Sequence, residues 1–381
     1  MRILLCCPVA VDPKYGAAKV YIEVAAAFQR LGWDATLVGP EQVGAPPHTR
    51  EYQVALREYL RARAAGFDVV EYEHDKLPFP RASLPAGPLF VARSVLLIHN
   101  VLAARIPLRP GVRAWVGHLL YGRSRRRALE RIVADATVTC READLVNVPT
   151  TDDRDALVRH GIDPARIVVF PYALTAERRA ELGRATPGGD PPTIAFVGTF
   201  DPRKGMRDFP AIVAGVCDRV PDARFRLIGT RGMLPTAAEV LAVFPRRLRD
   251  RIAVTPTFQP SELPALLSGC SAGVFPSAVE GFPFGVLEML AAGLPVVAYR
   301  VPGPTAILSD EFLVPRGHTT TVTAKLVQLL TDANARSTAS DRASASAGEF
   351  CWDDIARQTT DEFQCRIRVA TRDTNRCSRT A

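Results

Sequence analysis

A chain of 381 residues, of which 47% are apolar and 23% charged, is long for a single hydrophobic core, so two globular domains are expected. No apolar run reaches the roughly 18 residues that span a bilayer, and the eight cysteines form neither a CxxC pair nor a Cys/His cluster at zinc spacing. We therefore expect a reduced, cytoplasmic protein without a signal peptide or a structural zinc site.

The net charge of +8 is concentrated in one segment, because nine arginines and a single acid, Glu130, lie between Arg93 and Arg131. Trp115, Val116, Leu119 and Leu120 precede an arginine cluster at helical spacing, which is typical of a helix lying on an anionic membrane. We predict peripheral attachment to the inner face of a membrane through four side chains: Arg123, Arg125, Arg126 and Arg127. The alternative is that the apolar residues pack on a sheet and the arginines are solvated. Nucleic acid is not expected, because no aromatic residues are interleaved with the arginines.

In chain order, the first half alternates apolar strands with amphipathic helices. The predicted strands are 2–8, 34–39, 68–73, 89–98, 136–140 and 145–149, and a helix is expected at 17–32. A Gly- and Pro-rich stretch at 183–192 indicates a linker, after which strands are predicted at 193–200, 223–229, 251–258, 272–277 and 295–300. This pattern predicts an α/β fold of two Rossmann-like, doubly wound domains that face each other across a cleft.

The predicted domains are an N-terminal domain at 1–185 and a C-terminal domain at 193–348. A helix at 349–370 is expected to pack back on the N-terminal domain, and residues 371–381 are expected to form a disordered tail.

The stretch "EGFPFGVLEML" contains the strongest functional signal, because Glu288 lies inside an otherwise apolar helix predicted at 284–292. The start of that helix suits an anion such as a diphosphate, and Glu280 precedes it by one loop. Both carboxylates can therefore face one ligand, and carboxylates accept hydrogen bonds from neighbouring sugar hydroxyls. The alternatives are a solvated loop residue for Glu280 and a buried ion pair for Glu288.

The E-x7-E spacing within "PSAVEGFPFGVLEMLAAGLPVVA", together with "FVGTFDPRKG", "RFRLIGTRG" and "VTPTFQPSELPALLSGCSAGVFPS", resembles the retaining GT-B glycosyltransferases of family 4 type, also called group 1. The resemblance covers most of the chain and is strongest from 145 to 300. It implies transfer of a sugar from a nucleotide-diphosphate sugar to a glycan or lipid-linked acceptor, with retention at the anomeric carbon and without a bound metal.

The resemblance also implies roles for single residues. Glu280 would hold donor-sugar hydroxyls, Glu288 the ribose, and Lys204 the diphosphate, with Arg203 as a second cation because Thr199 stands where the family has an arginine. Backbone groups near the donor would come from Gly16, Gly198, Phe282, Pro283, Phe284 and Gly285. His99, at the end of the strand predicted at 89–98, would lie near the reacting sugar, and a satisfied core histidine is the alternative.

Three other interpretations remain open or are disfavoured. A non-catalytic sugar-nucleotide or glycan-binding protein on the same scaffold is one, and a related GT-B phosphorylase or epimerase is another. An NAD-dependent oxidoreductase is disfavoured because neither half carries G-x-G-x-x-G after its first strand. The D-x-D formed by Asp153 and Asp155 lies at the start of a predicted helix. Acidic residues there interact with the free N–H groups of the first turn, so we do not expect this motif to bind a metal.

Overall fold

The computed structural model describes residues 1–12, 16–106 and 112–377, without the side chains of 16–17, 112–125 and 370–377. The chain forms two compact units: unit 1 comprises Met1–Ala103, Tyr121–Tyr172 and Trp352–Ala381, and unit 2 comprises Ala104–Leu120 and Ala173–Cys351. The division at 172–173 precedes the linker predicted at 183–192. The reason is that Tyr172 donates a hydrogen bond to the Ser94 carbonyl in unit 1, whereas the helix after it contacts unit 2.

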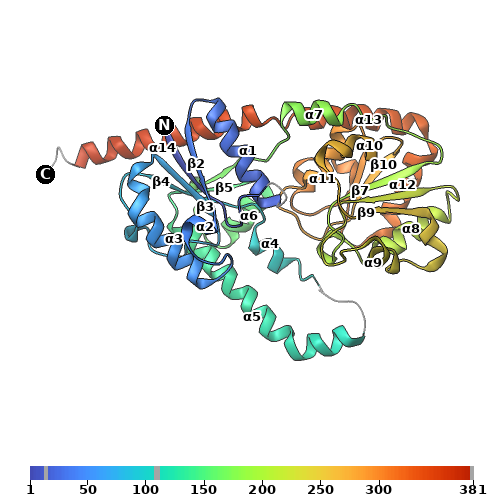
Figure 1. Ribbon diagram of the computed structural model, residues 1–381, viewed down its shortest axis with the longest axis horizontal. Helices are drawn as coiled ribbons and strands as arrows, with labels where there is room; N and C mark the ends of the chain where they lie inside the picture. Colours follow the sequence, from blue (N-terminus) through green and yellow to red (C-terminus); the bar gives the residue numbers. More distant parts are fainter. Residues whose placement is uncertain (13–15, 107–111, 378–381) are drawn as a thin grey trace. The chain divides into compact units, whose positions relative to one another are not determined.

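Unit 1 is built on a parallel six-stranded sheet in the order β2-β1-β3-β4-β5-β6 (Figure 1). Its strands are β1 (Arg2–Cys6), β2 (Asp34–Val38), β3 (Val69–Glu73), β4 (Leu89–Arg93), β5 (Leu145–Val148) and β6 (Ile167–Val169). Its helices are α1 (Gly16–Arg30), α2 (Pro40–Val43), α3 (Arg50–Arg63), α4 (Ile98–Ala103), α5 (Val112–Glu142), α6 (Thr151–Arg159) and α14 (Trp352–Cys377). Strands β3 and β4 are buried along their whole length, as a sheet covered on both faces requires.

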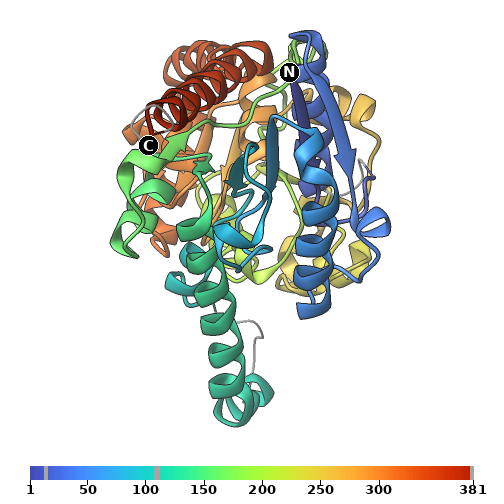
Figure 2. The same ribbon diagram turned by 90° about the vertical axis from the view of Figure 1, so that its left-hand side faces the viewer.

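One face of this sheet packs against α3, which lies over the strands in Figure 2. Tyr52, Leu56 and Leu60 are the buried apolar residues of α3, at the spacing of one helical stripe. Thr49 caps the first turn by accepting from the Tyr52 N–H. Since side chains alternate along a strand, Val70 and Tyr72 of β3 point into this core.

The strand predicted at 136–140 was wrong, because these residues belong to α5. The sequence "ATVTC" looks like a strand because it is rich in β-branched residues. In the helix, however, the hydroxyls of Thr137 and Thr139 donate to the carbonyls four residues earlier, and Val138 is exposed. Buried Ala136 and Cys140 provide the spacing of a helical stripe.

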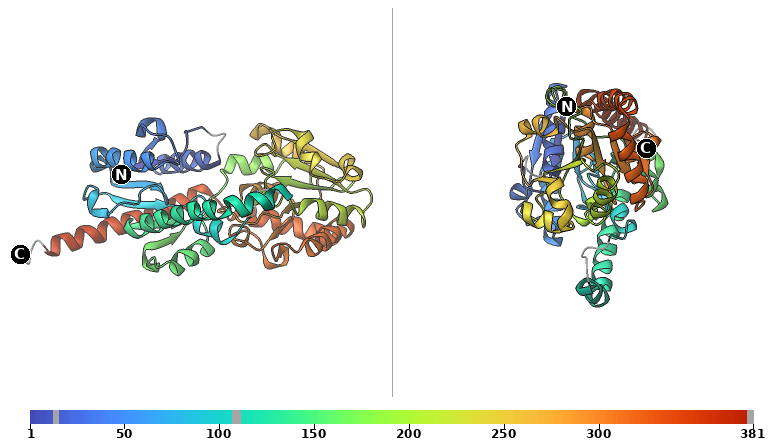
Figure 3. Two further views of the ribbon diagram at one scale, coloured as in Figure 1. Left: turned by 90° about the horizontal axis from the view of Figure 1, so that it is seen from below. Right: turned by 90° about the vertical axis from the view of Figure 1, so that its right-hand side faces the viewer.

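The C-terminal helix α14 is continuous from Trp352 to Cys377 and packs on α1 within unit 1 (Figure 3). The Phe28 and Phe363 rings lie 6.4 Å apart, and the Trp352 indole N–H donates to Glu23 at 2.8 Å. Residues 371–377, predicted as tail, continue the helix, and 378–381 lie outside the described residues.

Unit 2 carries a second parallel six-stranded sheet in the order β12-β11-β10-β7-β8-β9. Its strands are β7 (Thr193–Val197), β8 (Arg224–Ile228), β9 (Ile252–Thr255), β10 (Ala272–Phe275), β11 (Val296–Tyr299) and β12 (Leu313–Val314). Its helices are α7 (Ala176–Leu182), α8 (Phe209–Cys217), α9 (Ala237–Ala242), α10 (Leu263–Leu267), α11 (Phe284–Ala291), α12 (Thr319–Thr331) and α13 (Ala333–Gly348). The strand order reverses between β7 and β10, and α11 follows β10 at this switch point.

Gly285 allows α11 to lie against β7. A Cβ atom at this position would lie 2.2 Å from the carbonyl oxygen of Val197. The helix is apolar on every side, and the residues from Val286 to Ala291 are all buried. Close backbone packing therefore fixes where the first turn of α11 lies relative to the end of β7.

We expect Gly285→Ala to lower the free energy of unfolding by about 1–3 kcal/mol, because a backbone carbonyl cannot rotate away as a side chain can. Gly348→Ala is the matched control in unit 2, since its Cβ would meet no atom within 4 Å, and it should change stability by less than about 0.5 kcal/mol. Urea unfolding measures both. Equal stability of the two variants would contradict the close approach.

Candidate functional site

The loop after β10 holds a buried carboxylate between two cations. Glu280 is 4% exposed, and its Oε1 lies 2.7 Å from the Lys204 Nζ and 3.1 Å from an Arg203 guanidinium nitrogen. Both cations come from the turn after β7, and the Ala278 N–H donates to the Arg203 carbonyl at 2.7 Å, which joins the two loops. The interpretation of Glu280 as a solvated loop residue was wrong.

Asp201 fixes the conformation of the turn that carries the two cations. Its Oδ1 accepts from the backbone N–H groups of Arg203 and Lys204, and its Oδ2 accepts from the Thr199 hydroxyl at 2.8 Å. Gly198, with φ of 148°, ends β7 in a conformation that favours glycine. Thr199, where the resembled family has an arginine, therefore supports the turn instead of supplying charge.

Two cations, Lys204 and Arg203, lie beside the carboxylate of Glu280, and the carboxylate of Asp201 holds the turn that carries them. Burial lowers the pKa of Lys204, although Glu280 partly offsets this effect. Burial alone would raise the pKa of Glu280, but Lys204 and Arg203 outweigh it and hold that pKa below its usual range. The formal charges of the two cations and of the carboxylates of Glu280 and Asp201 therefore balance, and an anionic ligand would share Lys204 and Arg203 with Glu280.

Glu288 lies in the second turn of α11 and forms an ion pair. Its side chain is 11% exposed, and its Oε1 lies 3.2 Å from a guanidinium nitrogen of Arg178, which belongs to α7. The buried ion pair considered for Glu288 is therefore present. Arg178 lies 110 positions away in sequence, and no local pattern indicated it as the partner.

Most of the other residues predicted around the donor lie at the start of α11 or just before it. Phe282 is buried, and its ring lies 5.9 Å from that of Phe284 and 5.5 Å from that of Phe350. Pro283 occupies the N-cap position, and Gly285 packs on β7. Gly16 begins α1 in unit 1, next to residues outside the described part of the chain.

The prediction that His99 lies at the end of a strand was wrong. Strand β4 ends at Arg93, and His99 lies in α4. The ring is 2% exposed and stands edge-on to His160 at 4.6 Å. Its Nε2 lies 2.9 Å from the Thr137 hydroxyl, which itself donates to the Val133 carbonyl, so Nε2 is the protonated nitrogen. Burial lowers the pKa of His99 to about 3. This geometry matches the alternative of a core histidine better than a titrating base.

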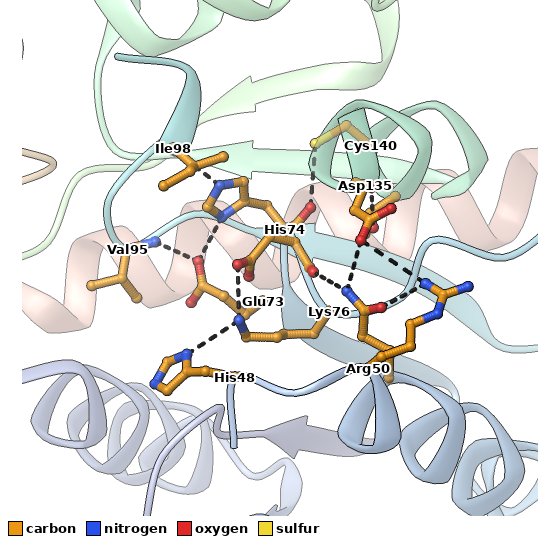
Figure 4. Close-up of polar contacts among 12 residues, drawn as sticks. His48, Arg50, Glu73, His74, Lys76, Val95, Ile98, Asp135 and Cys140 are labelled. Atoms are coloured by element: carbon orange, nitrogen blue, oxygen red, sulfur yellow. Dashed lines mark hydrogen bonds and ion pairs between the residues drawn. The ribbon is translucent and has the colours of Figure 1, made fainter. Parts of the chain in front are cut away.

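The end of β3 carries a polar cluster that the sequence interpretation missed (Figure 4). Glu73 accepts from the ring Nδ1 of His74 at 2.7 Å and from the Val95 N–H at 3.1 Å. The Ile98 N–H donates to the other ring nitrogen of His74 at 3.2 Å. These two side chains therefore hold the backbone between β4 and α4, and the run "EYEHDK" after an apolar strand start was the available signal.

Glu73, His74 and Asp75 are the described residues whose ligand atoms lie within 4.8 Å of one another, as a metal ion would require. Both ring nitrogens of His74 are engaged in the hydrogen bonds above, and the Lys76 ammonium lies 2.8 Å from Asp75. In this arrangement the three residues form a hydrogen-bonded cluster, not an open coordination site.

The two carboxylates of the D-x-D motif do not converge. Asp153 is fully buried and accepts from the Asn100 side chain at 2.6 Å, whereas Asp155 is exposed. Thr150, not an aspartate side chain, caps α6 by accepting from the Asp153 N–H. Burial raises the pKa of Asp153 to about 7.

We expect Asp153→Asn to stabilise the protein at pH 8 but not at pH 4. The folded pKa of about 7 exceeds the unfolded value of about 3.9, so the unfolded chain loses its proton first and stability falls as the pH rises through this window. Asparagine keeps the acceptor for Asn100 and removes the buried charge. The free energy of unfolding should therefore rise by up to roughly 4 kcal/mol above pH 7.

Unfolding in urea at both pH values measures this effect, with Asp155→Asn as the exposed control that should change little. A variant that is less stable than the parent at pH 8 would show that ionised Asp153 is favoured in the fold.

Residues 191–332 match the family model described as "Glycosyl transferases group 1". A D-inositol 3-phosphate glycosyltransferase of Corynebacterium glutamicum is 31% identical over 261 residues, covering 64% of this chain and 60% of that protein. An alpha-D-kanosaminyltransferase of Streptomyces kanamyceticus is 27% identical over 208 residues, covering 51% of this chain and 53% of that protein. The chain thus spans about half of the length of such curated relatives.

Several solved structures match almost the whole chain. Sucrose-phosphate synthase from Thermosynechococcus elongatus has a TM-score of 0.70 at 18% identity and covers 96% of this chain and 98% of its own. Anabaena HepE in complex with UDP and glucose has a TM-score of 0.67 at 16% identity and covers 96% of this chain and 100% of its own. Residues 191–332 therefore resemble the group 1 glycosyltransferases, and the two parallel six-stranded sheets have the GT-B fold of these solved structures.

Proposed function

We propose that this protein is a retaining glycosyltransferase that moves a sugar from a nucleotide-diphosphate sugar to a glycan or lipid-linked acceptor. The observation that carries the proposal is the pairing of two cations, Lys204 and Arg203, with the single buried carboxylate of Glu280. The cluster offers two cations that can donate to a diphosphate and a carboxylate that can accept from sugar hydroxyls. The family match of residues 191–332 and the UDP and glucose named for Anabaena HepE support the same ligand class.

In this proposal the diphosphate binds Lys204, Arg203 and the start of α11, whose dipole favours negative charge. Glu280 is released from one cation as the phosphates arrive and accepts hydrogen bonds from the donor sugar. Glu288 accepts from the ribose hydroxyls. Gly285 lets α11 lie close enough to β7 for these groups to meet one ligand within unit 2.

The main contribution to catalysis is stabilisation of the leaving diphosphate by fixed positive charge. Retention follows from a front-face displacement, in which a leaving phosphate oxygen takes the proton of the acceptor hydroxyl. We do not assign that proton transfer to His99, because its Nε2–H is held by Thr137 and burial lowers its pKa to about 3.

The non-catalytic binding protein is less well supported. It was suggested by the missing family arginine, but Thr199 has a definite use, because its hydroxyl holds Asp201 and so the cationic turn. A related phosphorylase or epimerase would use the same phosphate-binding groups, and only the products distinguish these enzymes from a transferase.

We expect Lys204→Met to reduce turnover at least about 100-fold, the range for removing one group that stabilises developing charge. Arg203→Met should reduce it less, since its side chain is 31% exposed and lies farther from Glu280. Release of nucleoside diphosphate from a panel of UDP-, GDP- and ADP-sugars measures turnover. Arg207→Met, which removes an exposed charge on the same loop, is the control.

Full turnover by Lys204→Met would contradict the assignment. A parent protein that binds nucleoside diphosphates but turns over no donor sugar would favour the non-catalytic alternative.

We also propose that α5 attaches the protein to an anionic membrane surface on the cytoplasmic side. Within the described residues no helix is long and apolar enough to cross a bilayer. Arg126 and Arg127 are exposed, and Arg126 forms an ion pair with Glu130, four residues on, at 2.8 Å. At 68% exposure this pair contributes little, so the arginine can exchange it for lipid phosphates. Arg123, Arg125 and the apolar positions lie where side chains are not described.

We expect the protein to sediment with vesicles rich in anionic phosphatidylglycerol and not with phosphatidylcholine vesicles. Replacing both Arg126 and Arg127 with serine should weaken binding roughly 30-fold, since each basic residue contributes about 1 kcal/mol. The matched control replaces two exposed arginines of unit 2, Arg246 and Arg247, with serine. If the parent stays in the supernatant at low salt, or both double variants bind alike, the surface of α5 is not the attachment site.

A further inference from the structure

Arg178 connects three segments of unit 2 that meet at Glu288. One of its terminal nitrogens donates to the carbonyl of Pro260 at 2.5 Å, and the other lies 3.2 Å from the Glu288 carboxylate. The first nitrogen also lies 3.3 Å from Glu181. Pro260 follows β9, Glu288 lies in α11, and Arg178 itself is held in the first turn of α7, where Thr175 accepts from its N–H. The arginine therefore links α7 with two segments at the carboxyl edge of the sheet.

This ion pair is buried and costly to form. The side chains of Arg178 and Glu288 are 10% and 11% exposed, and taking both charges out of water offsets much of their attraction. The Nε–H of Arg178 is buried and has no acceptor among the described residues, which adds to the cost. Glu181 is 44% exposed and contributes little. Stability alone is thus a weak reason for an arginine at this position.

The geometry indicates a positioning role instead. A guanidinium group is planar and rigid, so anchoring one nitrogen on the Pro260 carbonyl fixes where the other nitrogen points. That nitrogen takes one acceptor position on Oε1 of Glu288, and a carboxylate offers about four such positions. The carboxylate is therefore oriented before a ligand arrives, which lowers the entropy lost on binding.

We propose that Arg178 is a positioning residue of the nucleotide site: it orients the Glu288 carboxylate toward the 2′- and 3′-hydroxyls of the donor ribose. This inference rests on the proposed function, in which Glu288 binds the ribose. Arg178 makes no contact with the nucleotide in this arrangement. Its effect appears as the preference of the protein for a nucleotide that has both hydroxyls.

The test is calorimetric titration of the full-length protein with UDP, GDP and their 2′,3′-dideoxy counterparts. We expect the parent to prefer a ribonucleotide by roughly tenfold or more, the factor for losing one or two hydrogen bonds to a charged group. Glu288→Gln and Arg178→Met should both lose most of this preference, and the double variant should lose no more than either. Such non-additivity is the sign of residues that act as one unit.

Arg179→Met is the matched control, because the neighbouring Arg179 donates to the Gly348 carbonyl and does not contact Glu288. It should keep the preference of the parent. Arg178→Lys keeps the positive charge but lacks the planar guanidinium group with its two donor nitrogens. This variant should retain only part of the preference for the ribonucleotide. If Arg178→Met does not fold, Arg178→Lys and Arg178→Gln give the same comparison.

The outcomes separate the two proposals. If Glu288→Gln loses the preference while every Arg178 variant keeps it, Glu288 binds the ribose and the role of Arg178 is wrong. If an Arg178 variant binds the ribonucleotide more tightly than the parent, the arginine competes for Glu288 and the positioning role is also wrong. If the parent shows no preference, or Glu288→Gln keeps it, the ribose assignment of Glu288 fails and the inference fails with it.

Discussion

The burial of the Glu280 carboxylate is the constraint on which the proposed donor site depends. Burying a carboxylate without a partner costs free energy, so Glu280 needs a cation beside it. Two cations from the turn after β7 fill this role. The turn can present both because Asp201 accepts from the backbone of Arg203 and Lys204. The close packing of α11 on β7 through Gly285 places the Glu280 loop beside that turn. The packing of α11 and the ion pairs of Glu280 thus lie at the same edge of the unit 2 sheet.

Much of unit 2 was predictable from sequence because its signals are local. The E-x7-E spacing, the glycines around it and the cationic turn lie within short stretches. The packing of Gly285 on β7 was not predicted, since only backbone groups near the donor were expected at this position. The partner of Glu288 was not predictable in the same way. Arg178 lies 110 residues away, on a helix next to the expected linker, and only the fold brings the two together.

Unit 1 shows where composition misleads. The letters "SVLLI" continue a strand pattern, yet β4 ends at Arg93, because Glu73 and His74 take the N–H groups of Val95 and Ile98 that a ladder would have used. His99 is therefore carried into a helix and packed against His160. Residues 136–140 show the same kind of error, since a strand was predicted where the Thr137 and Thr139 hydroxyls bond to the preceding turn of a helix. The first error concerns contacts between distant residues, which periodicity cannot register, and the second concerns β-branched residues that a helix can accommodate.

The two carboxylates of unit 2 differ in how their charge is balanced, and this difference suits two parts of one ligand. Glu280 lies between two cations, and both cations can also donate hydrogen bonds to an arriving anion. Glu288 shares one guanidinium that is already anchored on the Pro260 carbonyl, so its pair is close to neutral. A carboxylate in such a pair suits hydroxyl groups, whereas two neighbouring cations suit phosphates. A nucleotide-diphosphate sugar presents both kinds of group within the length of α11, so its polarity would match that of the site from one end to the other.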